Sequence, residues 1–263
     1  MNLKRVLISG ASIAGPTLAY WLAKRGFEVT VVERAPAVRA GGYPIDIRGT
    51  AMEVVRRMGL EDRLRSERVD VDRLTFFDED GARLAAVRPL GYVDGVKRDL
   101  ELPRGALTAA LFSLTRGLDY RFSESISALE DDGEGVNVTF TSGVQERFAL
   151  VIGADGIHSS TRRLAFGDEA QFSRALGYCF AGFELPNDFG MAHEGRVWAT
   201  VGRSAMLYAP GDSATVHGML VVAAPEVPPA LHDDDASVRT FMASRFPDDV
   251  WLIPKMRACI QTS

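Results

Sequence analysis

The sequence predicts a mixed α/β fold in which a helix-covered parallel sheet is interleaved with a second, mainly antiparallel sheet. Three observations support this prediction. An apolar run, a helical stretch and another apolar run occupy residues 6 to 32. Two strand-turn-strand patterns follow in the middle of the chain, and β-type segments fill residues 176 to 224. The domains expected from these patterns are 1–70 with 98–170 and 71–97 with 171–263.

The first elements form a strand-helix-strand unit. A β-branched strand at residues 6 to 9 stops at Gly10, a helix follows over about 14 to 25, and Gly26 ends this helix before a second strand at 27 to 32. Parallel strands joined by a helix cross over with a right hand. The unit therefore predicts the start of a doubly wound, Rossmann-like sheet.

The middle of the chain mixes helices with hairpins. Turn sequences, DEDG and TSG, separate strand-like runs and predict hairpins. The evenly apolar run ALVIGA, residues 149 to 154, predicts a strand buried on both faces. The expected elements are a helix over 50–64 interrupted near Gly59, a hairpin over 74–77 and 83–87, a helix over 102–114, and a hairpin over 136–140 and 144–148.

The last third of the chain is rich in β-type patterns. The strands expected here are LGYCFAGFEL, RVWATVG, AMLYAP and TVHGMLVVAA, and GDSA forms a turn between the last two. A helix is expected near 236–246. Because the hairpin over 74–87 also leaves the parallel pattern, we expect it to join this second sheet.

Composition and charge narrow the class of partner. The 263 residues are 46% hydrophobic and 25% charged, as in globular proteins, and the net charge of −5 argues against nucleic acid or an anionic membrane surface. Two isolated cysteines and four scattered histidines show no metal-ligand spacing, so no metal site is expected. Neither a leader nor a membrane span is evident, which predicts a cytoplasmic protein that acts on small molecules.

The stretch ISGASIAGP, residues 8 to 16, indicates a dinucleotide site. Gly10 supplies the tight turn and Gly15 the close helix packing, while Ser12 replaces the usual middle glycine and adds a hydroxyl for a helix cap or a phosphate. Glu33 ends the second strand, where an acid accepts the ribose hydroxyls. NAD and FAD share this adenosine half, so the turn leaves both open. The predicted cofactor-binding residues of this unit are Gly10, Ser12, Ile13, Ala14, Gly15, Glu33 and Arg34.

Four motifs together resemble one enzyme family. They are GASIAGP with VVERAP, GGYPIDIRG at 41–49, LPRGALTAAL at 102–111, and VIGADGIHSSTRR at 151–163. Nearly all of the chain is similar to the flavin-dependent aromatic hydroxylases of the para-hydroxybenzoate hydroxylase type, especially the branch with the tetracycline-inactivating monooxygenases. The resemblance implies FAD as cofactor and NAD(P)H as reductant.

The resemblance also implies roles for single residues. Asp155 and Gly156, followed by Ser159 and Arg162, would pack on the pyrophosphate and ribityl region of FAD and affect the use of NAD(P)H. Arg104 would reach the FAD phosphates or ribityl chain. The structural alternatives are a strand-ending turn with a capped helix for the first four residues, and a surface arginine at a helix start for Arg104.

The loop GGYPIDIRG resembles the one that passes the isoalloxazine in this branch. Gly41 and Gly42 would give the backbone freedom, and Asp46 and Arg48 place opposite charges on one face of a strand. The flavin-proximal residues expected from the resemblance are thus Asp46 and Arg48, with Arg48 attracting either the negative charge of reduced flavin or the edge of the ring. A plain surface ion pair is the alternative.

The end of the sequence departs from the family pattern. Members carry a second FAD motif, a GDA run that opens a helix, whereas PGDSA at 210–214 stands between strands and is interpreted as a turn. DVWLIP at 249–254 is only weakly similar to the WxWxIP motif of flavin halogenases. We therefore expect a fragment or a truncated relative without the C-terminal part that closes over FAD. Such a chain is expected to bind FAD weakly or not at all, and to hydroxylate little.

These observations lead to one main hypothesis and two alternatives. The main hypothesis is an FAD-dependent monooxygenase that hydroxylates an aromatic or polyketide-like small molecule with NAD(P)H and O2. A non-catalytic nucleotide-binding domain is the first alternative. The second is an NAD(P)-dependent reductase or a flavin halogenase-like enzyme.

Overall fold

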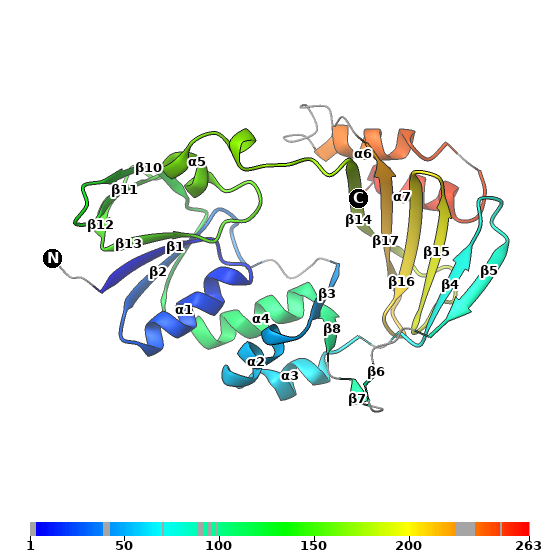
Figure 1. Ribbon diagram of the computed structural model, residues 1–263, viewed down its shortest axis with the longest axis horizontal. Coiled ribbons are helices and arrows are strands. Elements are labelled where there is room, and N and C mark those ends of the chain that lie inside the picture. Colours follow the sequence, from blue (N-terminus) through cyan, green and yellow to red (C-terminus); the bar gives the residue numbers. More distant parts are fainter. Residues whose placement is uncertain are drawn as a thin grey trace. The chain divides into compact units, whose positions relative to one another are not determined.

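The mixed α/β fold is confirmed. The computed structural model describes residues 4–38, 43–69, 71–88, 92–93, 96–97, 99–224, 235–247 and 249–262. The chain forms two compact units (Figure 1). The first unit comprises Met1–Gly42, Gly59–Ser66 and Pro103–Arg174, and the second comprises Tyr43–Met58, Glu67–Leu102 and Ala175–Ser263. The functional domains expected from the sequence, 1–70 with 98–170 and 71–97 with 171–263, stay a prediction.

The first unit is built on a parallel sheet in the order β13-β1-β2-β9. Its strands are β1 (Arg5–Ser9), β2 (Glu28–Glu33), β9 (Asp119–Phe122) and β13 (Leu150–Gly153). Side chains of β1 alternate between two apolar layers. Val6 and Ile8 pack with residues of α1 (Ala14–Lys24), whereas Leu7 packs with Phe140 and Phe148. This burial on both faces explains why the three central residues of β1 are all apolar.

Helices and a small antiparallel sheet cover the two faces of the parallel sheet (Figure 1). The helical side holds α1, α3 (Glu61–Ser66) and α4 (Arg104–Thr115). The other side holds β10 (Ile126–Asp131), β11 (Val136–Phe140) and β12 (Gln145–Phe148), and the unit ends with α5 (Ser160–Phe166) and the short helix η1 (Glu169–Gln171). The expected hairpin at TSG joins β11 to β12.

The interruption expected near Gly59 is confirmed. Two helices, α2 (Thr50–Arg57) and α3, occupy the range 50–66, and Gly59 has a positive φ of 72° between them. The prediction of a strand buried on both faces is wrong in degree. Val151 and Ile152 of β13 pack against the apolar clusters on the two faces, but no residue of the strand is fully buried. β13 is the edge strand of its sheet and pairs only with β1 among the described strands, so Leu150 is 49% exposed.

The second unit is built on a six-stranded sheet in the order β14-β17-β16-β15-β4-β5. Its strands are β4 (Arg73–Phe77), β5 (Arg83–Val87), β14 (Tyr178–Pro186), β15 (Glu194–Thr200), β16 (Arg203–Ala209) and β17 (Thr215–Ala223). The hairpin β4-β5 joins this sheet through a parallel pair with β15, as predicted. The turn predicted at GDSA connects β16 and β17.

One face of the six-stranded sheet is covered by two helices. These are α6 (Asp235–Ser244) and α7 (Ile253–Thr262), and Trp198, Leu207 and Phe246 lie fully buried between the sheet and the helices. The remaining small strands of the unit are β3 (Pro44–Ile47) paired with β8 (Leu100–Pro103), and β6 (Tyr92–Val93) paired with β7 (Val96–Lys97). The opposite sheet face carries no such helix pair among the described residues.

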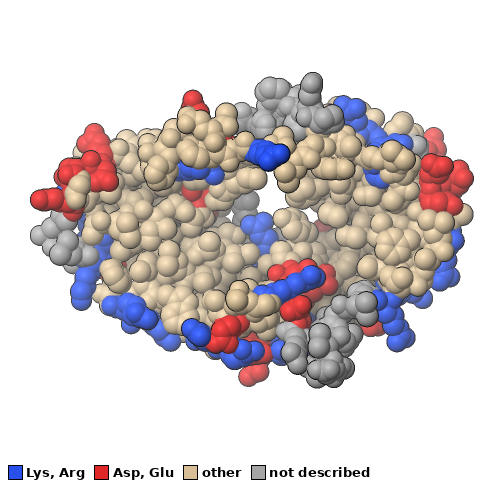
Figure 2. Space-filling model, viewed as in Figure 1, with Lys and Arg blue, Asp and Glu red and all other residues tan. Residues whose placement is uncertain are grey.

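The surface mixes both signs of charge. Figure 2 shows lysine and arginine side chains interspersed with aspartate and glutamate side chains over the visible face. Among the helices that the structure describes, none has the length and hydrophobicity to cross a membrane.

A nearly buried ion cluster closes one end of the second sheet. The Glu194 side chain is only 6% exposed, and its two oxygens lie 2.6 Å from Nη2 of Arg73 and 2.6 Å from Nη2 of Arg196. Burial raises the pKa of Glu194, but the two guanidinium groups outweigh it and hold that pKa below the ordinary value.

We predict that Leu207→Ala lowers the free energy of unfolding by about 2 to 5 kcal/mol, because the truncation leaves a cavity in a close-packed core. Leu84→Ala serves as the control, since Leu84 is 66% exposed on β5. Urea denaturation followed by circular dichroism measures both. Equal losses in the two variants would contradict the packing described here.

We predict that Glu194→Gln lowers the free energy of unfolding by about 1 to 3 kcal/mol at pH 7. Because the pKa of Glu194 is lowered in the folded state, its ionised carboxylate stabilises the fold at pH values above the unfolded-state pKa of about 4.3. This stabilisation is lost as the pH falls through the folded-state pKa. The difference between wild type and variant should therefore shrink below about pH 4.3. Denaturation curves from neutral to acidic pH test this, with exposed Asp212→Asn as control.

Candidate functional site

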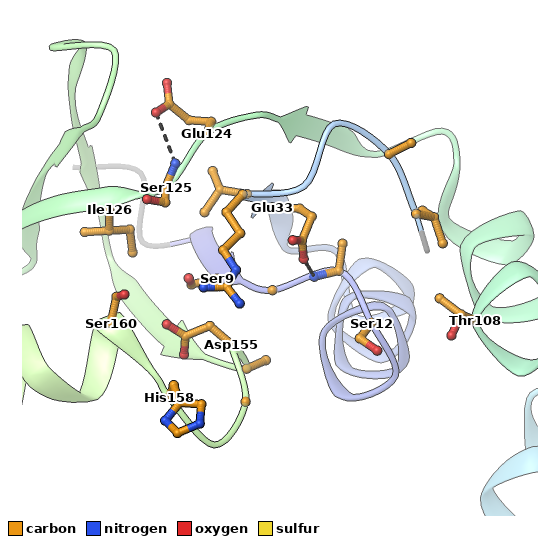
Figure 3. Close-up of a pocket in the computed structure, with 18 of the residues that line it drawn as sticks. Ser9, Ser12, Glu33, Thr108, Glu124, Ser125, Ile126, Asp155, His158 and Ser160 are labelled. Carbon is orange, nitrogen blue, oxygen red and sulfur yellow. Dashed lines mark hydrogen bonds between the residues drawn. The ribbon is translucent and has the colours of Figure 1, made fainter. Parts of the chain in front are cut away.

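Three loops at the carboxyl edge of the parallel sheet form a groove in the first unit (Figure 3). They are the β1–α1 turn, the segment after β2 and the loop between β13 and α5, and α4 and the start of β10 complete the wall. The groove is lined by Ser9, Gly10, Ala11, Ser12, Val32, Glu33, Arg34, Ala37, Val38, Arg104, Thr108, Glu124, Ser125, Ile126, Ala154, Asp155, Gly156, His158 and Ser160. Ligands bind at this edge in open α/β sheets.

Two glycines of the β1–α1 turn are required by the fold itself. Gly10 has a φ of 110°, and a Cβ atom there would lie 2.3 Å from the carbonyl oxygen of Ala154. A Cβ atom on Gly15 would lie 1.9 Å from the carbonyl oxygen of Gly10. No side chain fits at either place, so the turn brings bare backbone to the groove.

Ser12 contacts an arginine from a distant part of the sequence. Arg104, the first residue of α4, donates from Nη2 to Oγ of Ser12 at 3.0 Å. The first turn of α1 receives no side-chain cap, so the helix-cap role considered for Ser12 is not observed. The serine hydroxyl and the guanidinium instead form a polar pair at the groove.

Glu33 is held at the turn by backbone donors. Its Oε2 accepts from the amide of Ala11 at 2.8 Å, and its Oε1 accepts from the amide of Ala35 at 2.9 Å. Figure 3 shows the Glu33 side chain beside the β1–α1 turn. Each carboxylate oxygen retains a further lone pair, so the position is compatible with hydroxyl donors from a ribose.

Asp155 organises the loop after β13. Its Oδ2 accepts from the amide and the hydroxyl of Thr161 at 2.9 and 3.0 Å, and its Oδ1 accepts from the Ser159 hydroxyl. Burial raises the pKa of Asp155, but these hydrogen bonds outweigh it and lower the pKa below the ordinary value. Asp155 is therefore a carboxylate whose charge the loop itself stabilises.

Ser159 and Arg162, also predicted as cofactor-binding, do not line the groove. Ser159 caps α5 by accepting from the amide of Arg162 at 2.9 Å. Arg162 donates to the carbonyl of Ile157 at 2.7 Å, and its guanidinium lies 5.9 Å from the ring centre of Phe172. Both residues hold the shape of the loop, while Asp155 and Gly156 face the groove.

The remaining predicted residues divide between the units. Arg34 lines the groove, whereas Ile13 and Ala14 lie at the start of α1 outside its lining. Asp46 and Arg48 belong to the second unit and form an exposed ion pair of 2.7 Å. Their predicted position near a flavin stays a prediction, and Gly41 and Gly42 lie outside the described residues. No group of metal-ligating side chains occurs in the described ranges.

Sequence reasoning missed several lining residues. Thr108 follows Arg104 by one helical turn, so the helical period was a usable signal for it. Glu124 and Ser125 follow β9 without any motif. The pKa of Glu124 falls to about 2, because hydrogen bonds from Ser142, Thr141 and Ser125 outweigh the raising effect of burial. His158 was considered only as a metal ligand, yet it lines the groove.

The groove fits an adenine dinucleotide on these observations. Its floor includes Gly10, where no side chain fits, and this permits close approach of a pyrophosphate. Arg34 and Arg104 supply cations for phosphate, and Glu33 supplies an acceptor at the end of the second strand. The donors and acceptors thus match a phosphate group and a ribose.

In the second unit, the sheet face opposite α6 and α7 is called the open face here. Its residues are Tyr178, Phe180, Gly182 and Glu184 of β14, His217, Met219 and Val221 of β17, and Ser204, Met206 and Tyr208 of β16. The Tyr43 ring lies 6.2 Å from the Phe180 ring, edge to face. The Tyr208 hydroxyl donates to Oε1 of Glu101 at 2.5 Å, and Nδ1 of His217 lies 3.8 Å from Oε1 of Glu184.

Comparison with known proteins gives consistent matches. Residues 4–224 match the family described as FAD binding domain. A flavin-dependent monooxygenase of an unknown prokaryotic organism is 31% identical over 252 residues, which cover 95% of this chain and 65% of that protein. An uncharacterized protein of Mycobacterium tuberculosis is 44% identical over 188 residues, which cover 70% of this chain and 50% of that protein.

A solved structure agrees with these matches. The chain is similar to the tetracycline destructase Tet(55), with a TM-score of 0.87 and 29% identity, over 100% of this chain and 67% of that one. The chain thus spans between half and two thirds of the length of these relatives.

We predict that Gly15→Ala destabilises the first unit, although alanine normally favours a helix over glycine by about 1 kcal/mol. The added methyl group would overlap the Gly10 carbonyl, and the turn must shift to relieve it. Gly117→Ala is the matched control, because nothing lies within 4 Å of its Cβ position. Thermal unfolding measures both, and a Gly15→Ala variant as stable as the control would contradict the described turn.

Proposed function

The chain belongs to the FAD-dependent monooxygenase family, and on that premise we propose that the whole protein hydroxylates an aromatic or polyketide-like small molecule with NAD(P)H and O2. The observation that carries this proposal is the convergence of Gly10, Ser12, Glu33 and Arg104 on one groove, within the part of the chain that matches an FAD binding domain. Bound FAD would supply the redox chemistry and the activation of oxygen.

We assign the residues of the groove to the two ends of the adenosine half. The bare backbone of the β1–α1 turn and the guanidinium of Arg104 hold the pyrophosphate. The carboxylate of Glu33 accepts from the ribose hydroxyls, next to the amides that already hold it. Asp155 and Gly156 form the facing wall of the groove. The role of Asp46 and Arg48 as flavin-proximal residues stays a proposal that rests on the resemblance of their loop to the family.

In such a reaction, the residues of this chain bind and orient the cofactor and the substrate. Hydroxylation of this kind needs no protein nucleophile, because bound FAD would supply the redox chemistry. The protein groups instead position the ring of the substrate and exclude water.

We propose that the substrate lies on the open face. Three aromatic side chains, Tyr43, Tyr178 and Phe180, are 48%, 66% and 58% exposed there, which suits a flat apolar ring system. The Tyr208 hydroxyl gives its proton to Glu101, so it would accept a hydrogen bond from an enol or phenol of the substrate. Since the chain is similar to the tetracycline destructase Tet(55), a tetracycline-like polyketide is one candidate substrate.

We predict that Glu33→Gln weakens FAD binding about tenfold, because one amide N–H would face the side-chain amide and the ribose would lose an anionic acceptor. Arg104→Met should weaken it by at least as much. Quenching of flavin fluorescence measures the affinity. Glu130→Gln and Arg116→Met, which change exposed residues of the same unit outside the groove, are the controls.

Turnover provides the second part of the test. NADPH oxidation is measured with FAD, O2 and tetracycline as probe, together with the mass of the product. Gain of one oxygen atom supports the proposed function. A wild-type protein that binds no FAD, or groove variants that bind it like their controls, would contradict the assigned groove.

A further inference from the structure

A second pocket lies within the second unit, at the end of the six-stranded sheet where β4 begins and β5 ends. Figure 1 shows these two strands side by side at the edge of the sheet. The pocket is called the arginine pocket here. It has a volume of about 440 Å³, and Arg73, Arg88, His193 and Glu194 are among its lining residues. That volume lies in the range of small-molecule sites, and the pocket shares no lining residue with the groove of the first unit.

The pairing of β4 with β5 places two arginines opposite each other. Leu74 pairs with Val87 in this antiparallel ladder. The next position along both strands joins Arg73, the first residue of β4, to Arg88, which directly follows β5. Residues that lie opposite each other have Cβ atoms about 4.5 to 5.5 Å apart, and like charges at that spacing are destabilising. An anion bound by both guanidinium groups would remove this repulsion.

Glu194 compensates only one of these two arginines. It is the neighbour of Arg73 in the parallel pair of β4 with β15, and its Oε2 accepts from Nη2 of Arg73 at 2.6 Å. Its Oε1 accepts from Nε and Nη2 of Arg196 at 3.1 and 2.6 Å. Both oxygens of Glu194 are thus engaged. Arg88 is exposed and has no hydrogen-bond or ion-pair partner among the residues that the structure describes.

The charges around the pocket leave a positive excess. Arg73, Arg88 and Arg196 supply three positive charges. Asp72, an exposed lining residue, and Glu194 supply two negative ones. One guanidinium group therefore has no carboxylate to match it, and the local field favours an anionic ligand.

The fold holds Arg73 ready for such a ligand. The Glu194 side chain is only 6% exposed, whereas the Arg73 side chain is 57% exposed, so a nearly buried carboxylate fixes a guanidinium that solvent can reach. The backbone beside it is also fixed, because the amide of Asp72 donates to the carbonyl of His193 at 2.8 Å. A group that the protein already holds in place loses less conformational freedom when it binds.

We propose that the arginine pocket binds a phosphate dianion between the guanidinium groups of Arg73 and Arg88. The planar fork of arginine donates parallel hydrogen bonds to phosphate oxygens, and the dianion offsets the two like charges. The phosphate has two possible sources, which are inorganic phosphate and a phosphomonoester such as the 2′-phosphate of NADPH. Only the second source rests on the proposed use of NAD(P)H, and FAD has no phosphomonoester.

Isothermal titration calorimetry with inorganic phosphate tests the site in a buffer of about pH 8, where phosphomonoesters are also dianions. The wild type should bind phosphate with saturation. Arg88→Met should weaken this binding about tenfold, because one of the two forks is lost. Arg73→Lys keeps the charge beside Glu194 but removes the fork, and it should weaken the binding several-fold. Arg83→Met is the matched control, since Arg83 is an exposed arginine at the other end of β5.

Thermal unfolding separates ligand binding from a structural role. In phosphate-free buffer, Arg88→Met should be at least as stable as the wild type, because the change removes a like charge opposite Arg73. Phosphate should raise the unfolding temperature of the wild type and of Arg83→Met more than that of Arg88→Met, which then shows only the general effect of the salt. A loss of stability in Arg88→Met without phosphate would assign Arg88 to the fold and overturn the proposal.

Adenosine 2′-monophosphate distinguishes the two sources of phosphate. Binding tighter than that of inorganic phosphate, and weakened to the same extent in Arg88→Met, supports the site and identifies an NADPH-type ligand. Binding no tighter than that of inorganic phosphate supports the site and identifies free phosphate. If neither probe shows saturable binding, or if Arg88→Met binds phosphate like Arg83→Met, the proposal is wrong.

FAD binding is measured on the same variants. Quenching of flavin fluorescence should give the same affinity for the wild type and Arg88→Met, because the groove and the arginine pocket have no residue in common. Failure of the groove would therefore appear as lost FAD binding in the wild type. Failure of the arginine pocket would appear as lost phosphate binding in the wild type, so the two results are distinguishable.

Discussion

The close backbone approach at the β1–α1 turn is the constraint on which the first unit depends. The Gly10 amide donates to the Val32 carbonyl at 2.8 Å, and the Ala154 amide donates to the Ser9 carbonyl at 2.7 Å. The turn is thereby tied to the ends of β2 and β13 at once. A Cβ atom on Gly10 would meet Ala154, so the two loops can approach only because the side chain is absent. This contact creates the floor of the groove.

The same constraint accounts for the electrostatics of the groove. Three acidic side chains line it, which by itself would repel a phosphate. Glu33, Glu124 and Asp155 each accept hydrogen bonds from backbone amides, and Asp155 and Glu124 also accept from hydroxyls. Amide dipoles stabilise these carboxylates without using the arginine side chains. Arg34 and Arg104 therefore stay at the groove as positive charges that a phosphate can meet.

The two faces of the six-stranded sheet in the second unit differ in burial. The face under α6 and α7 buries Trp198, Leu207 and Leu220 completely, and this packing sustains the unit. The open face keeps aromatic rings exposed beside the hydrogen-bonded pair of Tyr208 and Glu101. Since alternate residues of a strand point to opposite faces, one stretch of sequence forms both the packed face and the open face.

The sequence by itself determined the mixed α/β class, the glycine turn, Glu33 at the end of β2, and the hairpin β4-β5 that joins the second sheet. These features have local causes, because periodicity, turn residues and the steric need for glycine act over a few positions. The sequence also indicated Arg104 as a cofactor-binding residue, although only through its place in the motif LPRGALTAAL.

The tertiary structure decided which residues meet across long separations. The contact of Ser12 with Arg104 joins residues 92 positions apart, and nothing in either segment specifies that pairing. The structure also moved Ser159 and Arg162 away from the groove lining into support of the loop, and brought His158 into that lining. The partial burial of β13 has the same origin. An apolar pattern sets a strand's preference for burial, but the strand's place in the sheet order sets how much of it is covered.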